Sequence, residues 1–264
     1  MKRGLFPKGF TIVETMIFLA VSSAILISAL TLVGGSQNKA EFTTALNDAN
    51  EQITAVINNV ANGYYPSSNK QCKDNPSSDK LEILGNSSEI GTESNCVYLG
   101  KVVEFSSGES FKVYNIAGLR VDTSGAVITD IANVKATAID NPEIFTLKNG
   151  LTVESIQNGS SAQKYGSIGF FTSLGKTDDE DQLISGSLST DFLALEPGGV
   201  NNSDDVPGLF PTATNSGYYN NNKNKPDGIR ICLKSGTSNE FGILQIGGQG
   251  RTATTSLTVQ GNCT

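Results

Sequence analysis

The sequence contains no histidine and no tryptophan among its 264 residues. Without histidine, a Ser-His-Asp triad, a Cys-His dyad and imidazole-based zinc sites are all excluded. The sequence also lacks a Walker phosphate-binding loop, a Gly-x-Ser-x-Gly nucleophile motif and a carboxylate pair suited to glycoside hydrolysis. We therefore predict that the protein is not an enzyme.

Charge is scarce as well, since only 17% of the residues are charged and the formal net charge is −7. This acidic balance disfavours a protein that binds nucleic acid by neutralising phosphates. The length allows one large domain or two small ones with a sizeable buried core.

The longest stretch without charge lies near the N-terminus, where residues 15–33 contain nothing more polar than Ser or Thr. At about 1.5 Å per residue this run just crosses a hydrocarbon layer of about 30 Å. It is longer than the apolar core of a secretory signal peptide, and no A-x-A cleavage site follows it. The basic residues Lys2, Arg3 and Lys8 precede it, which predicts a cytoplasmic N-terminus and an exported remainder.

One acidic residue, Glu14, is the single charged residue in the window from Phe10 to Gly35. A carboxylate inside a membrane segment is costly and is a functional candidate by default. The run Lys8-Gly9-Phe10-Thr11-Ile12-Val13-Glu14 resembles the class III signal of type IV prepilins, in its basic leader, its Gly-Phe junction and the acid four residues after Phe.

The resemblance implies that a prepilin peptidase cleaves between Gly9 and Phe10 and that the new Phe10 amine is N-methylated. It also implies that Glu14 pairs with the Phe10 amine of a neighbouring subunit during assembly. A carboxylate and an ammonium in apolar surroundings cost less together than apart, which fits this role. Many major pilins carry a proline in this helix, but none occurs here between Pro7 and Pro66, which favours a minor subunit.

After Gly35 the pattern becomes amphipathic, with apolar residues at steps of three and four from Phe42 to Val60. We predict one helix from about Phe10 to Val60, ended by Asn62-Gly63. The predicted organisation is a leader at 1–9, a transmembrane or filament-core helix at 10–35, its amphipathic half at 36–62, and an extracytoplasmic head at 63–264.

The head is predicted to be rich in β-strands, at 97–105, 110–116, 119–122, 126–131, 167–173, 228–234, 241–247 and 255–259. Asn149-Gly150, between two short apolar runs, predicts a type I′ hairpin. The fold class is therefore α+β, a long N-terminal helix packed on an antiparallel, pilin-like β head.

The C-terminal region has a looser resemblance to GspH/FimT-like minor pilins and pseudopilins, through Ile229-Arg230-Ile231-Cys232, Ile243-Leu244-Gln245-Ile246 and Gly250-Arg251. Some members of that group bind DNA through a Gly-Arg-x-Arg turn. Arg251 is the matching candidate here, but Ala253 stands where the second arginine belongs. DNA capture is therefore the weakest functional alternative.

Four cysteines, Cys72, Cys96, Cys232 and Cys263, would leave the reducing compartment if the head is exported. Three pairings are open, and the separation into two clusters favours Cys72 with Cys96 and Cys232 with Cys263. A zinc site built from four thiolates is disfavoured because no CxxC spacing occurs.

Oxygen-rich segments at 178–181, 201–205 and 220–227 raise calcium as a ligand, but the spacing of an EF-hand is absent. Solvated acidic loops explain them more simply. We predict no cofactor and no metal, with calcium as the alternative.

The leading hypothesis is a structural, minor subunit of a type IV pilus or pseudopilus. Its expected partners are other pilin subunits, the prepilin peptidase, the assembly platform and, through 10–35, the cytoplasmic membrane. It would then reach the cell surface in the filament. The alternative is a tip adhesin that contacts a surface or glycan through the polar loop at 197–228.

Overall fold

The computed structural model describes residues 11–63, 71–74, 81–84, 96–119, 124–128, 134–158, 161–163, 166–172, 190–195, 228–247 and 254–263. The chain divides into two compact units, Met1–Thr43 (the N-terminal unit) and Thr44–Thr264 (the head unit). One long helix, α1 (Ile12–Ala61), contributes residues to both units. Helix α1 together with antiparallel sheets makes an α+β fold, as predicted.

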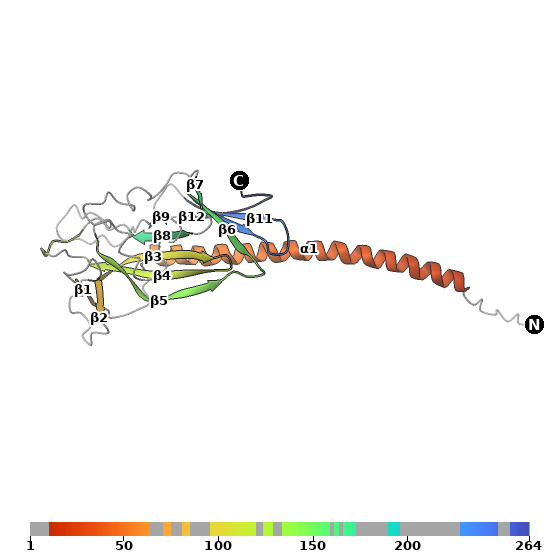
Figure 1. Ribbon diagram of the computed structural model, residues 1–264, viewed down its shortest axis with the longest axis horizontal. Helices are drawn as coiled ribbons and strands as arrows, with labels where there is room; N and C mark the ends of the chain where they lie inside the picture. The colour runs from red at the N-terminus through yellow and green to blue at the C-terminus, as the bar shows by residue number, and fades with distance from the viewer. Residues whose placement is uncertain are drawn as a thin grey trace, which may run out of the picture. The chain divides into compact units, whose positions relative to one another are not determined.

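In the N-terminal unit, α1 begins one residue after Thr11 and continues as regular helix (Figure 1). The predicted start, Phe10, lies outside the described residues. Gly34 and Gly35 lie within the helix without ending it. Both glycines have open space around them, since a Cβ atom added at either one would meet nothing within 4 Å.

The first large sheet of the head unit is formed by β3 (Cys96–Ser107), β4 (Ser110–Leu119), β5 (Ala136–Thr146), β8 (Gly166–Thr172) and β9 (Thr190–Leu195). Its order is β5-β4-β3-β8-β9, so β5 and β9 are the outer strands (Figure 1). Strands β4 and β8 are buried along nearly their whole length, which makes this sheet the centre of the core.

The second large sheet has the order β12-β11-β10-β6-β7. Its strands are β6 (Thr152–Asn158), β7 (Ser161–Gln163), β10 (Ile229–Lys234), β11 (Phe241–Gly247) and β12 (Thr254–Gln260). A separate two-stranded sheet pairs β1 (Gln71–Asp74) with β2 (Leu81–Leu84). Every strand pair in these three sheets is antiparallel.

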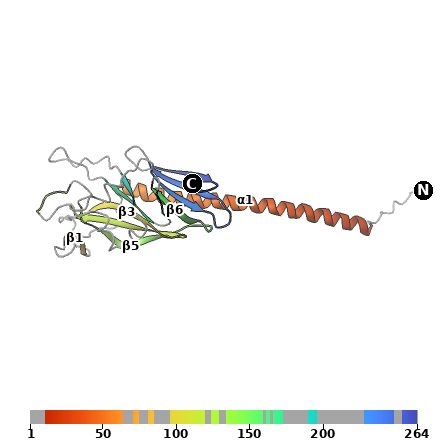
Figure 2. The ribbon, with the colours of Figure 1, turned by 45° about the horizontal axis from the view of Figure 1, so that its top comes forward.

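Within the head unit, the second half of α1 packs against the second sheet (Figure 2). Its apolar stripe is buried, as the three- and four-residue spacing predicts; it comprises Ala45, Leu46, Ala49, Ile53, Val56, Ile57 and Val60. Leu46 lies against Gly242 on β11, where a Cβ atom would approach its Cδ2 atom to 2.5 Å. The hydroxyl groups of Thr54 and of Thr255 on β12 share a hydrogen bond of 2.9 Å.

The end of α1 has the predicted glycine. Gly63 has a positive φ of 64°, and its N–H donates to the carbonyl of Val60 at 3.0 Å. Glycine is the usual residue in this left-handed position because it has no Cβ atom. The helix thus ends at Ala61, one residue beyond the predicted boundary.

The predicted hairpin around Asn149-Gly150 is correct as a turn and wrong as a strand pair. Both residues have positive φ values, 52° and 67°, and the N–H of Leu151 donates to the carbonyl of Lys148 at 3.0 Å. However, β5 pairs with β4 while β6 pairs with β10 and β7. The turn therefore carries the chain from one sheet to the other, because β5 belongs to the first large sheet and β6 to the second.

The other predicted strands vary in outcome. Those at 97–105, 110–116, 167–173, 228–234, 241–247 and 255–259 correspond to β3, β4, β8, β10, β11 and β12. Of 119–122 only Leu119 is described, as the end of β4, and of 126–131 the described residues hold one isolated bridge at Val127. Most of β5 and β6 and all of β1, β2, β7 and β9 were not predicted.

Candidate functional site

The candidate assembly site is the start of α1, where Thr11 and Glu14 form a reciprocal cap. The N–H and the hydroxyl group of Thr11 each donate to Oε2 of Glu14 at 3.0 Å. In return, the N–H of Glu14 donates to the Thr11 hydroxyl oxygen at 3.3 Å. This is a capping box, which satisfies backbone donors that the first helical turn leaves without partners.

The sequence interpretation of Glu14 did not include this local role. The signal for it was present, since a threonine followed three residues later by glutamate before an apolar run is typical of a helix start. The cap engages only Oε2 of the carboxylate. Within the described residues, Oε1 accepts no hydrogen bond, so this oxygen is available for an additional donor.

After Glu14, α1 exposes an apolar surface. Its large hydrophobic side chains are between 54% and 79% exposed; they are Ile12, Val13, Met16, Ile17, Phe18, Leu19, Val21, Ile25, Leu26, Ile27 and Leu30. Monomeric soluble proteins rarely expose continuous apolar patches of this kind. By its length and composition, α1 is able to cross a membrane.

Four of the hydroxyl side chains of this segment are bonded within the helix. Hydroxyl groups donate to backbone carbonyls three or four residues earlier, at 2.7 to 2.9 Å, in Thr15, Ser23, Ser28 and Thr31. In an apolar environment an unsatisfied hydroxyl group is costly, and these internal bonds remove that cost. The segment is thus suited to surroundings without water.

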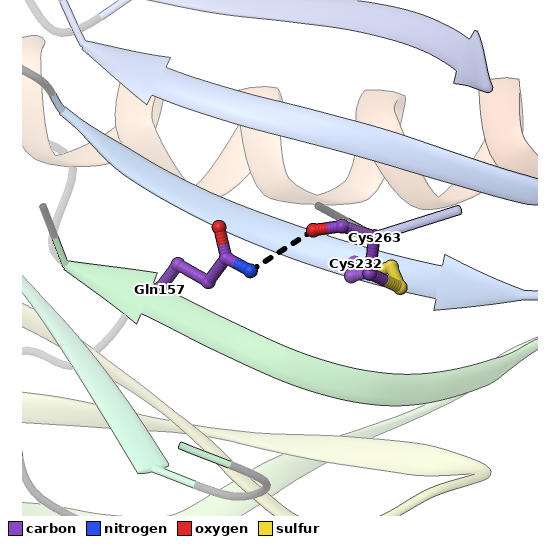
Figure 3. The surroundings of a disulfide bond; sticks show 3 residues. All are labelled: Gln157, Cys232 and Cys263. Carbon is purple, nitrogen blue, oxygen red and sulfur yellow. Dashed lines mark hydrogen bonds between the residues drawn. A yellow bond between two sulfur atoms is a disulfide. The ribbon is translucent and has the colours of Figure 1, made fainter. Parts of the chain in front are cut away.

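The head unit contains the predicted Cys232–Cys263 disulfide, with a Cα–Cα distance of 5.8 Å (Figure 3). It joins β10 to the residues that follow β12. The side-chain amide of Gln157 on β6 donates to the carbonyl of Cys263 at 3.0 Å, which gives the C-terminal segment a second attachment (Figure 3).

Cys72 is also disulfide-bonded, as predicted for a head without free thiols. The side chain of its expected partner, Cys96, lies outside the described part of the structure. On the backbone, Cys96 is opposite Leu119 in the β3–β4 ladder, and Leu119 packs in one cluster with Cys72 and Leu81. This placement agrees with the favoured pairing.

The remaining candidates lie outside the described residues. They are the processing residues Gly9 and Phe10, the DNA-binding candidate Arg251, the acidic segments 178–181, 201–205 and 220–227, and all of the loop 197–228 except Gly228. Among the described residues, no group of three or more acidic or cysteine side chains is arranged to hold a metal ion.

Comparisons with protein-family models, curated proteins and solved structures found no match for this chain.

Proposed function

We propose that the protein is a structural subunit of a type IV pilus or pseudopilus, assembled through the first half of α1. The observation that carries the proposal is the row of large, exposed apolar side chains from Ile12 to Leu30. Such a surface needs an apolar cover. Before assembly the membrane supplies this cover, and in the filament core the helices of other copies supply it.

The start of the helix supports the same proposal. Glu14 is the only charged residue in the apolar segment, and only one of its two carboxylate oxygens is used by the Thr11 cap. If cleavage after Gly9 creates an amine at Phe10, a neighbouring amine has an acceptor in Oε1 without breaking the cap. The ion pair would offset the cost of placing either charge in the filament core.

The proposal is tested by expressing Glu14→Ala and measuring its amount in sheared filaments against its amount in the membrane. We expect membrane insertion to persist and filament incorporation to fall by at least about tenfold, which corresponds to roughly 1.4 kcal/mol per subunit contact. Glu41→Ala, at an exposed acid on the same helix, is the matched control and should incorporate normally. Normal incorporation of Glu14→Ala would contradict the proposal.

The adhesin alternative depends on residues 197–228, which lie almost entirely outside the described structure, and so it stays a prediction. Deletion of this loop separates the two functions. An adhesin would lose attachment while filaments still form, whereas a purely structural subunit would leave attachment unchanged.

A further inference from the structure

The head unit contains a cavity of about 270 Å³ between the second half of α1 and the first sheet. Helix α1 contributes Asp48, Glu51 and Gln52 to its lining, strand β3 contributes Lys101, and strand β5 contributes Glu143 and Phe145. None of these residues belongs to the N-terminal unit, so the cavity has no part in the proposed assembly contact.

Lys101 is the unusual member of this set. Its side chain is only 2% exposed, yet within the described residues it makes no ion pair and no hydrogen bond. Removing an ammonium from water without a partner is strongly unfavourable. A buried cation that lines a cavity therefore points to an anionic group that binds there.

A bulge in β5 lies beside this lysine. Lys101 is opposite Asn115 on β4, and Asn115 is opposite Ile139 on β5. The next pair along joins Val113 to Glu143, so residues 140–142 of β5 stand against a single residue of β4. Bulges of this kind redirect an edge strand and commonly adjoin binding sites. Here the bulge precedes the two β5 residues that line the cavity.

The acceptors around the cavity are only partly used. Asp48 is satisfied, since its Oδ1 accepts from Lys148 at 2.7 Å and its Oδ2 accepts from the Gln52 amide at 2.8 Å. The other end of that amide, Oε1 of Gln52, is buried and has no hydrogen-bond partner. The carboxylates of Glu51 and Glu143 are exposed at the cavity rim.

This distribution of charge favours a ligand that carries both signs. A simple anion would meet the acids Glu51 and Glu143, and a metal cation would meet the Lys101 ammonium. A small zwitterion complements both groups at once. The wall formed by Phe145, which stacks on buried Phe111 with centroids 5.1 Å apart, adds an apolar contact.

We propose that this cavity binds a free α-amino acid. Its carboxylate pairs with Lys101, its ammonium group donates to Glu143 and Glu51, and its side chain lies against Phe145. The size agrees, because pockets for drug-sized molecules span about 300–1,000 Å³ and this cavity is slightly smaller.

The test is calorimetric titration of the full chain in detergent with a panel of free amino acids, each compared with its N-acetyl and its amide derivative. At least one free amino acid should bind with a Kd of about 1 mM or tighter. Its two derivatives should bind at least about tenfold more weakly, since each lacks one of the two charges.

Two variants assign the contacts. Lys101→Met should weaken binding of the free amino acid at least about tenfold, while Lys73→Met, at an exposed lysine on β1, should not change it. Glu143→Gln alters an exposed side chain and should preserve the fold. It should weaken binding of the free amino acid and leave the residual binding of its N-acetyl derivative unchanged.

Three results would each overturn the proposal. The first is no saturable binding by any amino acid, and the second is equal binding by wild type and folded Lys101→Met. The third is that glucuronate, a hydroxylated carboxylate without an amine, binds as tightly as the best amino acid. Thermal melting of each variant establishes that it is folded. If Lys101→Met does not fold, Glu143→Gln still tests the proposal.

Discussion

The two halves of α1 are both rich in apolar residues, but they differ in what covers them. In the head unit, Leu46 and Val60 are completely buried and Ile53 is 2% exposed. In the N-terminal unit, Ile25 and Ile27 are more than 60% exposed. The second half is therefore covered by its own chain, whereas the first half leaves its apolar side chains exposed.

Residue type separates the two halves as clearly as burial does. The second half alternates its apolar stripe with charged and amide side chains, and one of them, Asp48, pairs with Lys148 at 2.7 Å. The first half has one charged residue before Gly35, and four of its hydroxyl groups bond to their own helix. One half is therefore built for a sheet surface and the other for apolar surroundings on every side.

The largest expected contrast comes from truncating one isoleucine in each half. Ile53→Ala should lower the free energy of unfolding of the head unit by about 2–5 kcal/mol, because it leaves a cavity in the core. Ile25→Ala should change it by less than about 0.5 kcal/mol, because its side chain is already exposed. Denaturant titration in detergent measures both free energies of unfolding. Similar losses in the two variants would contradict the difference between the two halves of α1.

The next effect concerns the covalent link, which is specific to the head unit. Replacing both Cys232 and Cys263 by serine should destabilise the head by about 2–4 kcal/mol, through loss of the closed loop. The helical content of the N-terminal unit, which contains no cysteine, should persist. Thermal unfolding followed by circular dichroism tests this, and an unchanged melting temperature would contradict it.

The smallest expected effect compares two glycines. Gly242→Ala places a Cβ atom against Leu46 and should cost about 1–3 kcal/mol by overpacking. Gly35→Ala meets nothing within 4 Å and should stabilise the isolated helix by up to about 1 kcal/mol. Leu46→Ala combined with Gly242→Ala is the control, since it makes room for the added methyl group. If Gly242→Ala is neutral by denaturant titration, the close packing of α1 on β11 is wrong.

The sequence predicted the helix closely because its signals are local. The uncharged run at 15–33, the apolar steps from Phe42 to Val60 and the glycine at its end each depend on residues a few positions apart. Strand β11 was predicted at 241–247 and lies at Phe241–Gly247. The pairing of Cys232 with Cys263 also followed from the separation of the two cysteine clusters.

Features that depend on distant contacts could not be predicted from the sequence. The Asn149-Gly150 turn has the backbone of a hairpin, but its flanking strands pair with β4 and β10, which only the tertiary structure decides. The sequence around Lys101 is that of an ordinary strand. Its side chain is buried only because the second half of α1 packs near it in the tertiary structure. Burial of a single charge is not visible in local patterning.

The central claim, that the first half of α1 serves filament assembly after cleavage at the Gly9–Phe10 bond, is tested most directly by mass spectrometry of the chain recovered from sheared surface filaments. The account predicts a chain that begins at Phe10 and carries one additional methyl group on its amine. Recovery only of a chain that begins at Met1, or complete absence of the protein from the filament fraction, would contradict it.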